Sequence, residues 1–112
     1  MEKFVISKKT SGEFKFDFID KKGTVILSSG SYTRKRMCIN GIESVRRNSQ
    51  DCKKFNRKAS SSSEPYFNLK AFNGKILGIS QVFEDKVSRD SGIESVKSKA
   101  PIAPVEDLSK KV

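Results

Sequence analysis

The sequence has 112 residues, a net charge of +10 and no histidine, which excludes histidine-based acid–base catalysis and histidine metal ligands. Its length suits one compact domain, and half of it would bury only a marginal core. The positive excess is shared by both halves, with 11 basic and 6 acidic residues up to residue 51 and 12 and 7 beyond it. The charge therefore indicates either an anionic partner or a means of keeping the protein soluble.

The first third of the chain predicts a unit of three short strands. Residues 4–6 are an apolar stretch, and residues 13–20 alternate strictly, with three phenylalanines on one face. Lys22-Gly23 then supplies the positive φ of a tight hairpin turn before a returning strand at residues 24–27.

A helix is expected after this hairpin. Thr33 is a suitable N-cap, and Cys38, Ile42 and Val45 share one face at helical spacing. Gly41 lies beside them and costs the helix about 1 kcal/mol relative to alanine. We interpret it as a point where the helix packs closely on the sheet, with contact to a ligand as the alternative.

The second half of the chain repeats the first at a shift of 51 residues, without a gap. The clearest match places residues 41–45 on residues 92–96, an identical run of Gly-Ile-Glu-Ser-Val. In all, 13 of 51 aligned pairs are identical, which indicates a tandem duplication.

The repeated elements follow in the same order. Residues 66–70 predict a strand with alternate side chains on opposite faces, Asn73-Gly74 a hairpin turn, and residues 75–77 a returning strand. In the second helix Arg89 takes the place of Cys38, so we expect this helix to pack loosely there or its arginine to reach past the core to solvent.

The tail, residues 101–112, contains Pro101 and Pro104, so any strand in it is expected to be short and at a sheet edge.

The sequence and its two cysteines also indicate the compartment. No stretch resembles a signal peptide or a membrane span. We therefore expect no membrane association, a cytoplasmic location, and free thiols at Cys38 and Cys52.

Several repeated residues carry a family resemblance. They are residues 66–71 (Tyr-Phe-Asn-Leu-Lys-Ala), Asn73-Gly74, residues 92–96, Ala100-Pro101 and residues 105–108 (Val-Glu-Asp-Leu). With them the chain resembles the YegP-like family, also called UPF0339 or DUF1508. The resemblance implies an α+β fold of tandem duplicated β3-α-β units that form a single sheet, with both helices on one face. It also implies that the strand after each helix is exchanged between the units, here residues 54–57 and a segment near Val105.

The resemblance bears on organisation but not on activity. It implies one domain built of two repeats, residues 1–51 and residues 52–112. Because members of the family with one unit reach this architecture as dimers, we expect the two-unit chain to be a monomer, with a weak dimer as the alternative. Ser91 departs from the asparagine usual before the glycine, and the family has no established activity to transfer.

No motif in the sequence indicates a reaction. There is no phosphate-binding glycine loop, no dinucleotide-binding glycine pattern and no Cys-x-x-Cys pair. We therefore expect no catalytic residue, no cofactor and no metal site. The preferred interpretation is a non-enzymatic module with a structural or protein-interaction role.

The alternative is sequence-independent binding of nucleic acid. Basic residues crowd the junction between the repeats, and others are expected on the strand face opposite the phenylalanine core, where an aromatic ring could stack a base. The candidate contacts are Arg46, Arg47, Lys53, Lys54, Arg57, Lys58, Lys15, Tyr66 and Lys70. This hypothesis requires the basic residues to converge on one surface.

Overall fold

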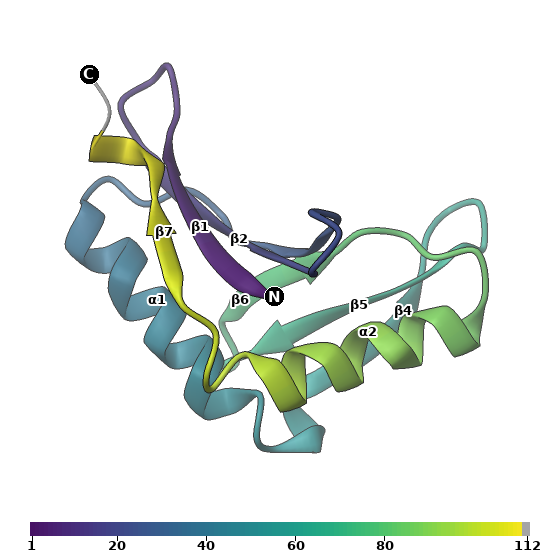
Figure 1. Ribbon diagram of the computed structural model, residues 1–112. Coiled ribbons are helices and arrows are strands. Elements are labelled where there is room, and N and C mark those ends of the chain that lie inside the picture. The colour runs from purple at the N-terminus through teal and green to yellow at the C-terminus, as the bar shows by residue number, and fades with distance from the viewer. Residues whose placement is uncertain (111–112) are drawn as a thin grey trace.

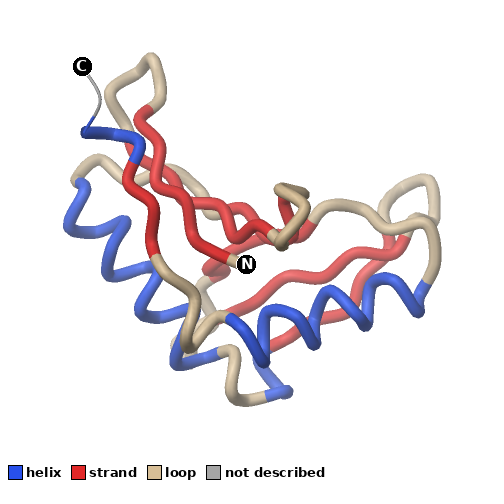
Figure 2. Tube along the Cα trace, viewed as in Figure 1, coloured by secondary structure: helices blue, strands red, loops and turns tan. Residues whose placement is uncertain are grey.

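The structure is a computed structural model that describes residues 1–110. The strands are β1 (Lys3–Lys8), β2 (Phe14–Ile19), β3 (Val25–Ser28), β4 (Phe55–Ala59), β5 (Pro65–Lys70), β6 (Ile76–Ser80) and β7 (Val105–Asp107). The α-helices are α1 (Lys35–Asn48) and α2 (Lys86–Lys99), and two short 3-10 helices are η1 (Cys52–Lys54) and η2 (Leu108–Lys110). Within the described range the strands form one seven-stranded sheet, with both α-helices on the same face (Figures 1 and 2).

The two repeats are joined into one sheet at its centre. The strand order is β4-β5-β6-β3-β2-β1-β7, and β3 pairs antiparallel with β6, placing Leu27 opposite Ser80 and Ser28 opposite Ile79. The last strand, β7, runs parallel to β1, so the first and last strands of the chain lie side by side (Figure 1). The predicted α+β fold and its tandem duplication are confirmed.

The strand after each helix lies in the other half of the sheet. β4 follows α1 and pairs with β5, whereas β7 follows α2 and pairs with β1. β4 begins at Phe55, one residue later than expected, and it is also the first strand of the second repeat. One strand thus serves two positions, which is why seven strands are seen in the described chain where two complete β3-α-β units would have eight.

The tail forms a short strand at a sheet edge, as its prolines predicted. β7 has only three residues and lies at the edge of the sheet. Its entry is fixed by a hydrogen bond of 2.9 Å from the Phe4 backbone N–H to the Pro104 carbonyl oxygen. The expectation for the tail also covered residues 111–112, which lie outside the described residues.

Phenylalanine rings form the core in both halves. Phe16 and Phe67 occupy equivalent positions, and both are fully buried between sheet and helix. Phe16 meets Phe4 edge-to-face with ring centroids 6.0 Å apart, and Phe67 meets Phe55 in the same way at 5.8 Å. The alternation read from the sequence therefore assigns the inward face correctly in both repeats.

The recurring helix glycine has a packing role. A Cβ atom at Gly41 would lie 2.4 Å from the Tyr32 hydroxyl oxygen, and one at Gly92 would lie 2.8 Å from Cζ of Phe83. Both distances are shorter than any real contact, so an aromatic ring occupies the space of the missing side chain. This confirms the interpretation of close packing between helix and sheet.

The two helices begin differently, and the prediction of Thr33 as N-cap is wrong. Arg34 holds the N-cap position of α1 and its side chain accepts no hydrogen bond. At the equivalent place in α2, the Asp85 carboxylate accepts a hydrogen bond of 2.7 Å from the Ser88 backbone N–H. Only α2 therefore has a side-chain cap.

The unequal caps lead to a stability prediction. Arg34→Asp should raise the free energy of unfolding by about 0.5–1 kcal/mol, because aspartate caps the helix and an anion suits its N-terminus. Urea unfolding followed by circular dichroism measures the change. As a control, Asp85→Arg should lower stability, and an unchanged or lower stability of Arg34→Asp would contradict the assignment of Arg34 as the N-cap.

Candidate functional site

The basic residues named from the sequence do not all lie on one surface, although Arg47 and Lys54 line the same cleft and Lys58 lies opposite Tyr66. They divide among the last turns of α1, the segment from η1 to β4, and the sheet face opposite the helices. These groups are Arg46 and Arg47, then Lys53, Lys54, Arg57 and Lys58, and finally Lys15, Tyr66 and Lys70. The nucleic-acid hypothesis requires all of them on one surface, and in the described chain only some of them are neighbours.

Arg46 belongs to the framework of the fold. Its Nη2 donates a hydrogen bond of 2.9 Å to the Ala103 carbonyl oxygen, and Nε lies 3.3 Å from a carboxylate oxygen of Glu43. Its guanidinium also lies over the ring of Phe4, 5.4 Å from the centroid. The side chain thus links α1 to the segment before β7, and most of its surface is covered.

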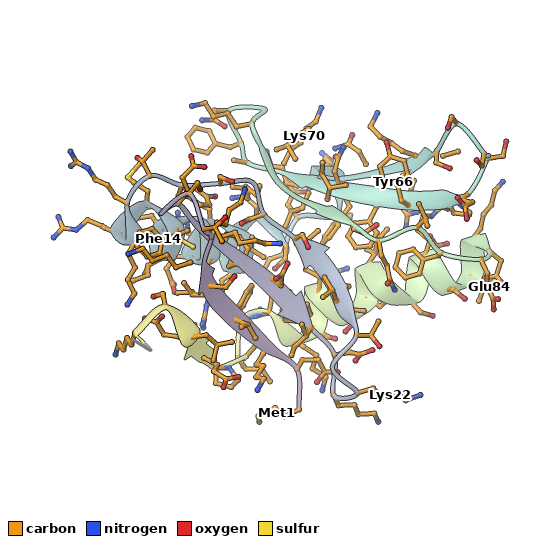
Figure 3. All side chains as sticks on the ribbon, turned by 90° about the horizontal axis from the view of Figure 1, so that it is seen from above. Met1, Phe14, Lys22, Tyr66, Lys70 and Glu84 are labelled. Carbon is orange, nitrogen blue, oxygen red and sulfur yellow. The ribbon has the colours of Figure 1, made fainter. Side chains whose placement is uncertain are left out.

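The sheet face opposite the helices carries less free charge than expected. Lys15 lies 3.1 Å from the carboxylate of Asp17, which neutralises it locally. Tyr66 and Lys70 do project from β5 on this face (Figure 3). β3 and β6 lie between β2 and β5, so Lys15 and Lys70 are far apart across the sheet.

Asn68 lies between Tyr66 and Lys70 on β5. It was expected to be exposed to solvent, but it is buried. Asn68 is only 3% exposed, and its Oδ1 has no hydrogen-bond partner among residues 1–110. Asn68 therefore offers little polar surface to a ligand on this face.

The edge strand β4 presents alternate side chains to opposite sides of the sheet. Phe55, Arg57 and Ala59 face the helices, whereas Asn56 and Lys58 face the other way, because β4 pairs Arg57 with the inward Phe67 and Lys58 with the outward Tyr66. Lys58 is exposed, and so is Lys53 in the preceding η1.

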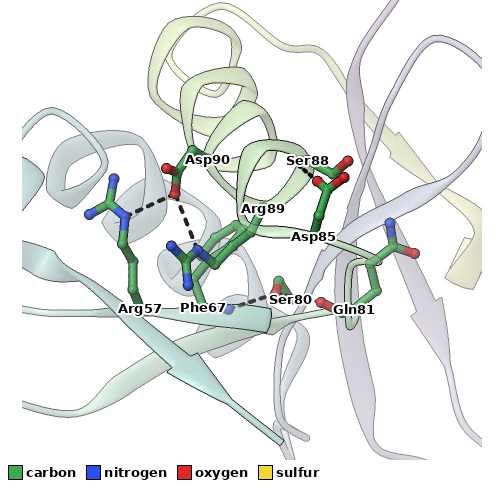
Figure 4. A network of polar contacts seen from close by, with 8 residues as sticks. All are labelled: Arg57, Phe67, Ser80, Gln81, Asp85, Ser88, Arg89 and Asp90. Carbon is green, nitrogen blue, oxygen red and sulfur yellow. Dashed lines mark hydrogen bonds and ion pairs between the residues drawn. The ribbon is translucent and has the colours of Figure 1, made fainter. Parts of the chain in front are cut away.

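On the helix side of this edge, three charged residues form a network (Figure 4). Arg57 and Arg89 both direct Nε to the same Asp90 oxygen, at 3.0 Å and 3.2 Å. The hydrogen bond from Arg57, with the help of Arg89, holds the pKa of Asp90 below its usual range. Arg89 is only 9% exposed, so the expectation that it packs loosely or reaches to solvent is wrong. Its partner Asp90 lets it occupy the buried position that Cys38 has in the first repeat.

Within the described residues, the backbone of β4 is unpaired on its outer side. Ser60 donates its N–H to the Glu64 carbonyl at 2.9 Å, so Ser60 and Glu64 form a hydrogen-bonded pair. Bonded and non-bonded pairs alternate along an antiparallel ladder. Arg57 and Ala59 therefore belong to the non-bonded pairs, and their N–H and C=O groups point away from β5. Pro65, opposite Ala59, has no N–H to donate, which agrees with this register.

The two edges of the sheet differ in charge. Lys53 and Lys58 form no ion pair within the described residues, so the β4 edge keeps its positive charge. At the other edge, β7 carries Glu106, paired with Lys3 at 2.5 Å, and Asp107, paired with Lys35. The β4 edge is thus the longer and the basic one.

The cysteines offer little reactive chemistry. Cys38 is buried, and burial together with the charge of Asp107 raises its pKa to about 11, so its thiol stays protonated at neutral pH. Cys52 is exposed and is not bonded to Cys38. Residues 1–110 contain no group of three or more potential metal ligands, and neither α-helix is long and apolar enough to cross a bilayer.

Arg57 was expected from the sequence to be a site residue, but its partner Asp90 was not. The two residues are 33 positions apart, and only the antiparallel course of β4 and the packing of α2 bring them together. The available hint was local: the arginine that replaces Cys38 has an acidic neighbour, as a buried arginine requires.

Known proteins match this chain over both repeats and nearly its whole length. A family model described as a domain of unknown function, DUF1508, matches residues 10–53 and residues 60–107, one match in each repeat. A UPF0339 protein encoded in the 5′ region of the ptx operon of Stutzerimonas stutzeri is 44% identical over 105 residues, which is 94% of this chain and 95% of that protein. The UPF0339 protein YegP of Escherichia coli is 39% identical over 104 residues, 93% of this chain and 94% of its own.

A solved relative has the same fold. The solution NMR structure of a UPF0339 protein from Shewanella oneidensis superimposes with a TM-score of 0.91 at 38% identity, covering 96% of this chain and 92% of that one.

Proposed function

The chain belongs to the DUF1508 family, and we propose that it is a non-enzymatic protein-interaction module that binds an extended acidic segment of a partner along the edge of β4. The observation that carries the proposal is the combination of outward backbone groups on β4 with two exposed lysines, Lys53 just before the strand and Lys58 on it, that form no ion pair within the described residues. Each feature alone is common, but together they specify both the conformation and the charge of the ligand.

The backbone supplies the affinity. An extended peptide placed beside β4 would accept a hydrogen bond from the N–H of Arg57 and that of Ala59 and would donate to their carbonyl groups. Its side chains would alternate between the two sides of the sheet, next to Lys58 on one side and Arg57 on the other.

The charges supply the selectivity. Lys53 and Lys58 would repel the β4 edge of a second copy, because like charges on neighbouring strands are destabilising. The same lysines attract a strand that carries carboxylates. An acidic partner is therefore favoured over self-association through this edge.

Nucleic acid is less well supported by the geometry. Three strands separate Lys15 from the β4 edge, and Arg46 is held by backbone carbonyls. A nucleic-acid backbone would also not pair with the outward N–H and C=O groups of β4 in the way that an added strand does. The test below distinguishes the two ligands.

The experiment measures binding of two probes by fluorescence anisotropy at low salt. The first is a labelled heptapeptide of alternating glutamate and valine, and the second is a labelled oligonucleotide of twenty thymidines. Ala59→Pro removes one outward N–H without removing an internal hydrogen bond or a charge. It should weaken peptide binding at least tenfold, and Lys53→Glu with Lys58→Glu should do the same.

A matched control carries the same charge change elsewhere: Lys21→Glu with Lys22→Glu, in the exposed turn before β3. It should leave peptide binding nearly unchanged. Oligonucleotide binding that is lost on Lys53→Glu with Lys58→Glu but unaffected by Ala59→Pro would overturn the proposal in favour of nucleic acid. Peptide binding that is insensitive to Ala59→Pro would exclude strand addition.

A further inference from the structure

Each helix lies against the hairpin turn of the other repeat, and a cleft is present at each of these two places. The first cleft, of about 580 Å³, lies between α1 and the turn that joins β5 to β6. The second, of about 540 Å³, lies between α2 and the turn that joins β2 to β3. A shift of 51 residues relates their linings, so the duplication has produced two equivalent clefts that can be compared position by position.

The comparison shows that the clefts have diverged at the polar residues beside the helix glycine. Tyr32 and Asn40 in the first cleft correspond to Phe83 and Ser91 in the second. Neither the Tyr32 hydroxyl nor the Asn40 amide makes a hydrogen bond to another described residue. Burial raises the pKa of Tyr32, so its hydroxyl remains a donor. The first cleft thus holds polar groups without an internal partner where the second has a ring and a small hydroxyl.

The first cleft also gathers positive charge. Arg47, Lys54 and Lys75 line it, and none of them forms an ion pair with any residue between 1 and 110. The one carboxylate in the lining, that of Asp51, already accepts a hydrogen bond of 3.0 Å from the Lys53 backbone N–H. The lining therefore has a net positive charge, held on three different elements that face one space.

Apolar side chains stand at the mouth of the same cleft. Phe72 is 84% exposed, Ile76 52% and Met37 50%, although large apolar side chains are usually covered. Phe72 and Met37 correspond to Lys21 and Ser88 in the second cleft. The second cleft also has an exposed apolar residue, Val87 at 75%, but its two lysines, Lys21 and Lys22, are balanced by Glu2 and Asp20. Only the first cleft therefore combines apolar surface with a net positive charge.

We infer that the cleft between α1 and the β5–β6 turn binds a small organic anion. A carboxylate or a phosphate monoester would lie between Arg47 and Lys75, and an aromatic or aliphatic body would cover Phe72. The Tyr32 hydroxyl would donate to an acceptor on the ligand. The volume falls in the range of small-molecule sites, and this site is separate from the proposed peptide edge.

The test is an NMR titration of the uniformly ¹⁵N-labelled protein with four probes: benzoate, phenyl phosphate, benzyl alcohol and inorganic phosphate. Benzoate, phenyl phosphate or both should shift the backbone amides of Asn40, Gly41 and Gly74 in a saturable way. Benzyl alcohol and inorganic phosphate should each bind at least fivefold more weakly, because each lacks one half of the ligand. The preference between benzoate and phenyl phosphate identifies the anionic group.

Three variants complete the test. Arg47→Gln with Lys75→Gln should weaken binding at least fivefold, and because both side chains are exposed the fold should persist. Tyr32→Phe, which reproduces the residue of the second cleft, should weaken binding of the anions about threefold or more. Lys21→Gln with Lys22→Gln, the same charge change at the other turn, should have no effect. The inference is overturned if no probe gives saturable shifts, or if shifts occur equally at Ser91 and Gly92.

Discussion

Replacing Phe16 or Phe67 by alanine is expected to lower the free energy of unfolding by similar amounts, about 3–5 kcal/mol each. Both rings are fully buried, and each packs between a second core phenylalanine and an aromatic ring under the helix glycine. Phe16 stacks with Tyr32 at 6.3 Å between ring centroids, and Phe67 stacks with Phe83 at 6.1 Å. Because both rings lie within the cluster of buried core side chains, each replacement should leave a cavity and cost stability accordingly.

Urea unfolding of the two variants and of Phe72→Ala measures this expectation. Phe72 is a suitable control because it is the same residue type in a largely exposed position, and its replacement should change stability by less than about 0.5 kcal/mol. A variant of Phe16 or Phe67 as stable as the parent would mean that the two repeats do not share an equivalent core.

The strands and the duplication could be predicted because their causes are local. Residues 13–20 alternate with period two, and half-buried strands require that period whatever their neighbours are. Gly23 and Gly74 mark the hairpin turns through their positive φ angles of 87° and 85°. The shift of 51 residues then transfers each assignment from one repeat to the other.

Details set by long-range contacts could not be predicted. The start of α1 differs from the predicted start because Thr33 was chosen by residue type alone, whereas Arg34 holds the N-cap position. The burial of Arg89 depends on its hydrogen bond to Asp90, whose carboxylate also accepts a hydrogen bond from Arg57. Arg57 reaches Asp90 only because β4 pairs with β5. Residue type indicates polarity, but it does not indicate a partner that is distant in sequence.

The same limit applies to the candidate site. The basic residue types were identified correctly, but Arg57 and Lys58, adjacent in sequence, lie on opposite sides of the sheet because side chains alternate along a strand. Arg46 is held by backbone carbonyl groups more than fifty residues away. A cluster of charges in the sequence is therefore not a patch until the strand register is known.

The fragment of residues 1–48 is expected not to fold as a monomer. It would keep β1, β2, β3 and α1 but would lose both strands that border them, β7 beside β1 and β6 beside β3. Leu27 shows the consequence: it is fully buried in the intact chain and packs against Gly78, where a Cβ atom would lie 2.8 Å from its Cγ. In the fragment this side chain and the edge of β3 would be open to water. A chain of this length also buries too small a share of its surface to offset the entropy of folding.

Circular dichroism during heating and sedimentation equilibrium of the fragment give the result. We expect either no cooperative transition or a dimer, in which a second copy supplies the missing half of the sheet. The full chain, measured under the same conditions, should melt sharply. A monomeric fragment with a sharp melt would contradict the dependence of one repeat on the other, because the contacts of β3 with β6 and of β1 with β7 would then be dispensable.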